Sequence, residues 1–211
     1  MSDSVQEYKF FTIEECDEIK KYCYKKEEEL IKEGYADVMS DVSTESITTS
    51  NYFRYNFFRD HPIYAERLVD FLKQTQENLH WPILVQSWVN VYRKGNGIGW
   101  HYHKGNMGKS LTANIFIDGP TKPGTSYLAE NGQEMIEINR ENKRGYIQIV
   151  PCTVYHKVNL VDTERLSVGI TIHGFDYLNE DIMNTFAFNH KKSSNNSIYD
   201  FTTSHLILRR D

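Results

Sequence analysis

Two histidines separated by one residue, His101 and His103, are the best candidates for metal ligands in this sequence. The surrounding segment 98–103 follows a glycine-rich turn and has the composition of a strand. Successive side chains of a strand point to opposite faces, so the two imidazoles share one face and can converge on one ion. Two histidines alone are weak evidence, because a site needs a third ligand.

His156 and His173 could each supply that ligand. His156 follows a predicted strand and turn, at the rim of a sheet, where functional sites collect. His173 ends a strand that begins at Arg165, and eight extended residues span about 26 Å at roughly 3.3 Å per residue. That length places His173 toward the other end of the barrel. We therefore expect His156 to bind the metal and His173 to be structural.

The strand 165–174 alternates between two kinds of side chain. One face carries Arg165, Ser167, Gly169 and Thr171, and the other carries Leu166, Val168, Ile170 and Ile172. If the apolar face packs on other elements, the polar face lines a cavity or meets water. An arginine with a hydroxyl two residues later can bind a carboxylate by charge-assisted hydrogen bonds. A solvent-facing arginine on an edge strand is the alternative explanation.

The order of these pieces resembles the iron(II)- and 2-oxoglutarate-dependent oxygenases, most closely the prolyl-hydroxylase-like branch and its small bacterial and phage relatives. The resemblance covers about residues 83–175. The helix start at residues 11–16 is also similar to the N-terminal part of proteins of that branch. The pieces that carry it are Tyr92-Arg93-Lys94-Gly95, His101-Tyr102-His103, the strand 111–118, Gly124-Thr125-Ser126-Tyr127-Leu128, Lys143-Arg144-Gly145, His156 and Arg165-Leu166-Ser167.

This resemblance implies a dioxygenase of the hydroxylase type, which uses Fe(II), 2-oxoglutarate and O2 and gives succinate, CO2 and a hydroxylated product. It implies that His101 and His156 bind the iron. It makes Arg165 the partner of the distal carboxylate of 2-oxoglutarate, with Ser167 and Tyr92 assisting there. No catalytic side chain beyond the metal ligands is expected.

Position 103 departs from the family pattern, in which Asp or Glu stands two residues after the first histidine. We expect His103 to be the third ligand of a three-histidine iron centre. Two alternatives stay open: His103 points away and leaves a more open site, or the chain has kept the fold and lost the activity. Asn114, on the same face as Thr112 and Phe116, is a further candidate for contact with cosubstrate or substrate, and a structural hydrogen bond is the alternative.

Two other functions compete with the oxygenase. Three histidines can also hold a catalytic zinc with a bound water, although Arg165 then has no evident role. A jelly-roll binding module without a metal is the second rival.

Periodicity predicts the elements that position these residues. Thr12-Ile13-Glu14-Glu15 is a capping box that opens a helix over 13–33, and Pro62 begins a second helix that ends near His80. An aromatic strand is expected at 51–58 after a loop at 36–50. Short strands are predicted at 83–92, 98–103, 111–118, 125–129, 134–139, 145–150, 156–161 and 165–174.

This pattern predicts a single α+β, mainly β domain. Its core, residues 83–175, is a jelly roll, which the resemblance specifies as a double-stranded β-helix, and the helices of residues 1–82 pack on one sheet. Residues 176–211 form an extension with a short helix at 177–188, a loop at 191–197 and a last strand at 205–208.

Composition limits the partners. The 211 residues include 24 Lys or Arg and 29 Asp or Glu, for a net charge of −5, which disfavours a nucleic-acid coat or a polybasic membrane anchor. Three cysteines without a CxxC pair, no long apolar run and no signal-like start predict a cytoplasmic protein without disulfides.

The expected substrate is a small molecule or a peptide, with nucleic acid less favoured. Lys104 and Lys109 could favour an anionic substrate, although an ordinary turn is the simpler interpretation.

Overall fold

The computed structural model describes residues 5–32, 47–48, 56–103, 110–131, 134–174, 191–192, 198–200 and 205–209. Its helices are α1 (Ile13–Lys32), α2 (Phe57–Asp60) and α3 (Pro62–Thr75). Its strands are β1 (Gln6–Lys9), β2 (Ile47–Thr48), β3 (Ile83–Tyr92), β4 (Ile98–His101), β5 (Ser110–Asp118), β6 (Thr125–Asn131), β7 (Glu134–Arg140), β8 (Tyr146–Pro151), β9 (His156–Val158), β10 (Arg165–Gly174), β11 (Lys191–Lys192), β12 (Ile198–Asp200) and β13 (His205–Leu208).

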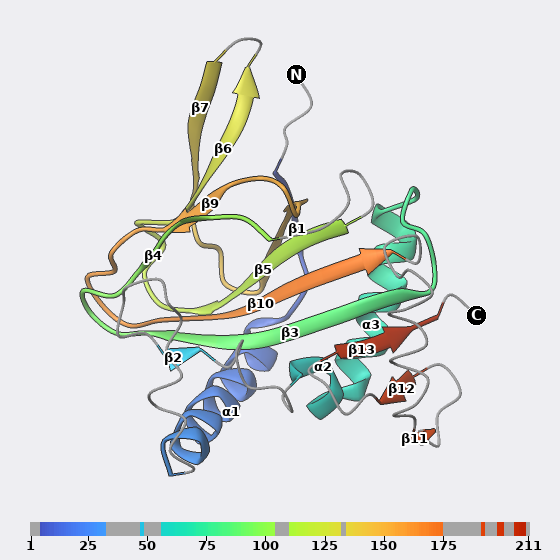
Figure 1. Ribbon diagram of the computed structural model, residues 1–211. Helices are drawn as coiled ribbons and strands as arrows, with labels where there is room; N and C mark the ends of the chain where they lie inside the picture. The colour runs from blue at the N-terminus through green and yellow to red at the C-terminus, as the bar shows by residue number, and fades with distance from the viewer. Residues whose placement is uncertain are drawn as a thin grey trace.

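The strands form two antiparallel sheets (Figure 1). The main sheet has the order β1-β8-β5-β10-β3-β13-β12-β11, with β2 also paired to β3. The minor sheet has the order β4-β9-β6-β7 and lies across one face of the main sheet. This arrangement is the predicted jelly roll. Each of the eight strands predicted between residues 83 and 174 is present, and β3 and β10 have the predicted bounds.

The helices cover the opposite face of the main sheet (Figure 1). The apolar face of β10, with Leu166, Val168 and Ile170, is fully buried in the core beneath them. At about 25 cal/mol per Å² of apolar surface, this burial is the main stabilisation available to the fold. The other face of β10 therefore lies between the two sheets.

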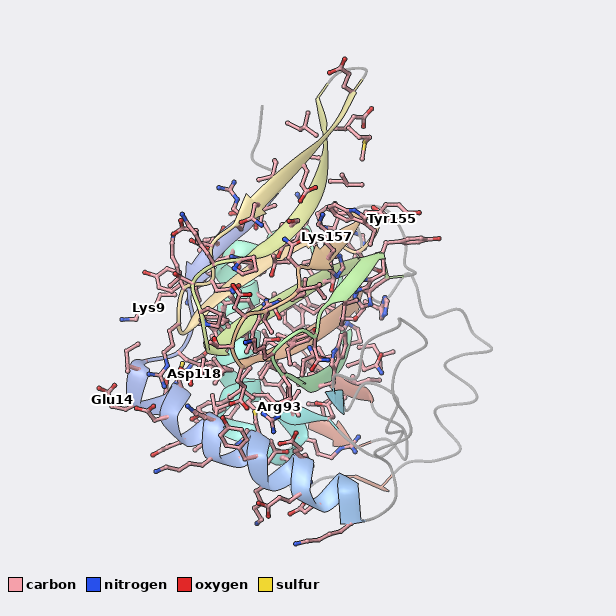
Figure 2. The ribbon with its side chains drawn as sticks, turned by 90° about the vertical axis from the view of Figure 1, so that its left-hand side faces the viewer. Lys9, Glu14, Arg93, Asp118, Tyr155 and Lys157 are labelled. Atoms are coloured by element: carbon pink, nitrogen blue, oxygen red, sulfur yellow. The ribbon has the colours of Figure 1, made fainter. Side chains whose placement is uncertain are left out.

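Polar contacts fix α1 on this core. The capping box forms, since Thr12 N donates to Glu15 Oε2 at 2.9 Å and Glu15 N donates to Thr12 Oγ1 at 3.2 Å. The Glu15 carboxylate also accepts two hydrogen bonds from Arg67 of α3, at 2.8 and 2.6 Å. Figure 2 shows Arg93 and Asp118 beside α1, where they pair with Glu27 and Lys20 respectively. The first helix is thus tied both to α3 and to the ends of two sheet strands.

The predicted aromatic strand at 51–58 is wrong at its C-terminal end, where Phe57 and Phe58 begin α2; residues 51–55 lie outside the described part of the chain. Asn56 explains the difference. Its Oδ1 accepts from Phe58 N at 3.1 Å and Arg59 N at 3.3 Å, while its Nδ2 donates to Val85 O at 2.9 Å. A buried helix cap bonded to β3 therefore overrides the β propensity of the aromatic residues.

Helix α3 ends at Thr75, five residues before the predicted end. Gln76 N still donates to Leu72 O, and Leu79 N then donates to Gln76 O at 3.0 Å, which forms a turn. This turn directs the chain into β3. The sequence pattern continued to suggest a helix because Leu79 is apolar and is buried all the same.

The C-terminal segment contributes to the main sheet. The predicted strand at 205–208 is confirmed as β13, which pairs with residues 83–86 of β3. Lys191 and Lys192, expected in a loop, instead pair with β12. The expected helix at 177–188 lies outside the described residues. Within the residues that the structure describes, no helix has the length and apolarity to cross a membrane.

Candidate active site

The pairing of β4 with β9 brings two predicted ligands together. His101 lies opposite His156 in this ladder, and His156 also lies opposite Tyr127 of β6. His103 follows two residues after His101, where its N–H donates to Cys152 O at 2.9 Å. Residues from three separate parts of the chain therefore meet at one end of the minor sheet.

The three imidazoles form a compact group. Each offers one nitrogen, and these nitrogens all lie within 4.8 Å of one another. The ring centroids are separated by 4.3 Å for His101 and His156, 5.5 Å for His101 and His103, and 5.2 Å for His103 and His156. Three neutral imidazoles at this spacing suit a transition-metal ion such as iron or zinc.

Hydrogen bonds leave one nitrogen free on two of these rings. His101 Nδ1 lies 2.9 Å from Gly99 O, and His156 Nδ1 lies 3.0 Å from Val154 O. A carbonyl oxygen only accepts, so Nδ1 carries the proton in both rings and Nε2 keeps its lone pair. This tautomer is the one required for a metal bound through Nε2.

Burial keeps the rings neutral. It lowers the pKa of His101, lowers that of His103 to about 3 with help from the neighbouring histidines, and lowers that of His156 to about 4 with help from His101. Metal binding requires the unprotonated ring. The site therefore has its ligands in the binding form at neutral pH.

The histidines open into a pocket between the two sheets, which has about 480 Å³ of empty space including its mouth. Trp88 lines it beside His103, with 5.6 Å between the ring centroids. Tyr92 lines it four residues further along β3, about 13 Å away at roughly 3.3 Å per residue. The pocket thus extends from the histidine group toward Arg165, which pairs with Tyr92 in the sheet.

Arg165 is a buried cation without a complete set of partners. Its residue is 0% exposed, and its Nη2 donates to Thr125 Oγ1 at 2.9 Å. Its guanidinium carbon lies 5.4 Å from the centre of the Tyr92 ring. No hydrogen-bond partner within the described residues reaches its Nε or Nη1. Burial lowers its pKa, as expected for a charge removed from water. Two unused donors on a buried guanidinium fit an anionic ligand such as a carboxylate.

The other predicted cosubstrate residues surround this point. Ser167 is buried, and its Oγ has no partner within the described part of the chain. Tyr92 lines the pocket, and burial raises its pKa to about 12. Asn114 also lines the pocket, opposite Gly169 of β10. The three histidines, Tyr92 and Asn114 thus line the pocket, whereas Arg165 and Ser167 do not line it. Arg165 contacts the lining residues Tyr92 and Thr125, and Ser167 pairs in the sheet with the lining residue Asn90.

Some pocket residues were missed by the sequence reasoning, chief among them Asn90, Thr125, Tyr127 and Gln148. Asn90 shares a face with Tyr92 by simple alternation, a signal that could have identified it. The Tyr127 hydroxyl donates to Gln148 Oε1 at 2.9 Å, which fixes a wall of the pocket beside His156. No sequence pattern predicts that contact.

His173 lies outside the three-histidine group. Its ring is buried and its Nδ1 lies 3.1 Å from Ser110 Oγ, which agrees with the expected structural role. It also approaches His103 closely enough to help lower the pKa of that ring. It is therefore less remote from the centre than the length of its strand suggested.

No family model matches the sequence, and no curated protein matches it at a significant level. Solved structures do match its fold. A prolyl-4-hydroxylase from Pseudomonas putida is 12% identical, with 82% of this chain and 94% of that chain covered and a TM-score of 0.59.

Two further structures show the same similarity. The viral collagen prolyl hydroxylase of Paramecium Bursaria Chlorella virus-1, in a 2OG complex, is 13% identical, with 82% and 97% of the chains covered and a TM-score of 0.55. EctD from S. alaskensis, with 2-oxoglutarate and 5-hydroxyectoine, is 12% identical, with 83% and 73% covered and a TM-score of 0.56. At such low identity, these similarities establish the jelly-roll fold of this chain.

Proposed function

We propose that the protein is an iron(II)- and 2-oxoglutarate-dependent dioxygenase that hydroxylates a C–H bond of a small molecule or peptide. One observation carries this proposal: a three-histidine group lines a pocket, and a fully buried, incompletely bonded arginine lies directly behind its wall, in contact with the lining residues Tyr92 and Thr125. The fold similarity to structures that contain iron or 2-oxoglutarate supports it.

The residues present fit both groups. Three neutral imidazoles suit Fe(II), with Nε2 of His101 and His156 available as donors. Arg165 Nε and Nη1 are unused donors that suit the distal carboxylate of 2-oxoglutarate, and Ser167 Oγ is an additional donor nearby. When bound, the metal and cosubstrate supply O2 activation through oxidative decarboxylation to succinate and CO2.

The contribution of the chain is to bind, orient and shield. Arg165 and the histidines would fix the two ends of 2-oxoglutarate, which reduces the entropy cost of positioning its oxo acid at the metal. The carbonyls of Gly99 and Val154 hold two ligand rings in one tautomer and orientation. Tyr92 and Tyr127 are buried walls that exclude water from the space between those ends.

The zinc alternative uses the same histidines, but it leaves the arginine without a function. A buried, incompletely bonded charge costs several kcal/mol, roughly, and a zinc-bound water makes no use of it. A 2-oxoglutarate carboxylate would compensate that charge.

As part of the same proposal we place the protein in the cytoplasm, consistent with three buried, free cysteines.

Anaerobic titration tests the proposed function. Fe(II) followed by 2-oxoglutarate should produce the weak visible charge-transfer band of a bidentate complex. His101→Ala and His156→Ala should each abolish it, and His103→Ala should weaken or abolish it if that ring is a ligand. His173→Ala is the matched control, because His173 is a nearby buried histidine outside the group. A zinc complex with no response to 2-oxoglutarate would favour the hydrolytic alternative.

A further inference from the structure

We infer that this pocket takes one anionic group in addition to 2-oxoglutarate, so that the substrate of the proposed enzyme is an organic anion with its charged group near the metal. The inference rests on the proposed function. His103 stands where the usual iron site has a carboxylate. The inference follows from the positive charge of the metal, which a neutral ring at this position does not offset.

The ligand group contributes no negative charge. His101, His103 and His156 would bind a metal as neutral imidazoles. The usual set for non-haem iron, two histidines and one carboxylate, contributes one negative charge. With histidine in place of that carboxylate, the ligands would leave the charge of a divalent metal ion without any offset.

The groups around these ligands do not restore that charge. A ligating histidine often donates its second N–H to a carboxylate, but here Gly99 O and Val154 O, both neutral carbonyls, accept from His101 and His156. Within the described chain, the charged groups that act on His103 and His156 are other histidines, and His101 is influenced by burial and by Gly99 O.

The walls of the pocket are also free of acidic side chains, as far as the structure describes them. A carboxylate close behind the wall, that of Glu7, accepts from Gln148 at 3.0 Å and is paired with Lys143. The surroundings therefore carry little uncompensated negative charge.

The remaining charge can be counted directly. A divalent ion in the pocket and Arg165 directly behind its wall would bring three positive charges, and 2-oxoglutarate two negative ones. One positive charge is left in a space that is partly removed from water, where an uncompensated charge is costly. With Asp at position 103 the count would be zero. A substrate carboxylate, or a free monoanion, offsets this charge.

The test uses Co(II) as a spectroscopic replacement for Fe(II). The cobalt protein is saturated with 2-oxoglutarate and then titrated with acetate, with its neutral analogue acetamide and with azide, following the visible d–d absorption. His103→Asp and His103→Asn are the matched variants, because their side chains are nearly equal in size and differ by one charge. Circular dichroism and the cobalt content confirm that each variant is folded and loaded.

We expect wild type and His103→Asn to bind acetate at least about tenfold more tightly than His103→Asp, the factor that corresponds to about 1.4 kcal/mol. Acetamide should show no such difference. Equal acetate affinities in the Asp and Asn variants, or no acetate binding to wild type, would overturn the inference. Azide binding without acetate binding would assign the charge to a free inorganic ion and would overturn the statement about the substrate.

Two outcomes separate this inference from the proposed function. If wild type binds no Co(II) or no 2-oxoglutarate, the proposed function itself fails and the inference fails with it. If both bind and acetate does not, only the inference fails. If His103→Asp loses its cobalt, acetate and acetamide are compared in the wild-type protein alone. Acetate must then bind at least about tenfold more tightly than acetamide, about 1.4 kcal/mol. An equal affinity refutes the inference.

Discussion

Replacement of Arg165 by methionine should separate ligand binding from stability in this protein. Methionine fills much of the same volume and removes the charge. If Arg165 is present for an anionic cosubstrate, the ligand-free protein gains little from it. A residue placed there for structure alone would be expected to have its hydrogen bonds satisfied, whereas Arg165 Nε and Nη1 are buried without a partner in the described chain.

The structure sets the size of both effects. Each unsatisfied donor costs about 1–3 kcal/mol, whereas the bond to Thr125 and the contact with the Tyr92 ring contribute together about 1–3 kcal/mol. For two donors the cost is about 2–6 kcal/mol, so Arg165→Met should change the ligand-free stability by between a loss of about 1 kcal/mol and a gain of about 5 kcal/mol. Loss of one partner of a buried charge pair costs about 2–5 kcal/mol of affinity. The Kd for 2-oxoglutarate should rise by about 30-fold to several thousand-fold.

Urea unfolding of the metal-free protein and calorimetric titration of the anaerobic Fe(II) protein measure these two quantities. Wild type should gain thermal stability on addition of 2-oxoglutarate, and the variant should not, because a ligand stabilises the folded state only to the extent that it binds. Arg165→Lys is the control that keeps the charge and loses the planar pair of donors. A variant that loses several kcal/mol of stability and keeps its affinity for 2-oxoglutarate would refute the reasoning.

Three further predictions concern the surroundings of the pocket. The metal-free protein should lose stability as the pH falls from about 6.5 toward 4, by up to about 1.4 kcal/mol per pH unit for each buried histidine. Stability falls with pH because folding lowers the pKa of His103 to about 3 and that of His156 to about 4, so the unfolded chain takes up protons first. Urea unfolding at several pH values measures this dependence, and a stability that does not change with pH would contradict it. Gly169→Ala would place a Cβ 2.5 Å from Trp88 Cε2, so the indole, which lines the pocket, must shift. We expect a loss of about 1–3 kcal/mol in stability and weaker 2-oxoglutarate binding, whereas an unchanged tryptophan fluorescence spectrum would show that Trp88 has not moved. Asn56→Ala removes the α2 cap and the bond to Val85 O, which should cost about 2–4 kcal/mol in urea unfolding, and a cost below about 0.5 kcal/mol would show that the cap is dispensable.

The sequence determined the strands of the core and the candidate ligands. Alternation along residues 165–174 separated Arg165 and Ser167 from Leu166 and Val168. The structure places the last two in the hydrophobic core, and the first two are buried on the opposite face of the strand. This success has a local cause, since the period of a strand depends on the backbone alone. The capping box that begins at Thr12 could also be predicted, because it too depends only on local residues.

Tertiary contacts decided what local patterns could not. Phe57 and Phe58 favour a strand by composition, but Asn56 bonded to β3 caps a helix there. The convergence of His101 and His156 depends on which strands pair and in which register, and that choice reflects the packing of the whole core.

The state of Arg165 was likewise invisible in the sequence. An arginine on a strand face can meet solvent or lie buried, and the sequence pattern is the same in both cases. Only the second sheet, packed over β10, removes its guanidinium from water and leaves two donors without partners in the described chain. The sequence by itself therefore determined which residues could do chemistry. The tertiary structure decided which of them line one pocket and which lie buried behind its wall, because burial and distance depend on contacts between segments far apart in the chain.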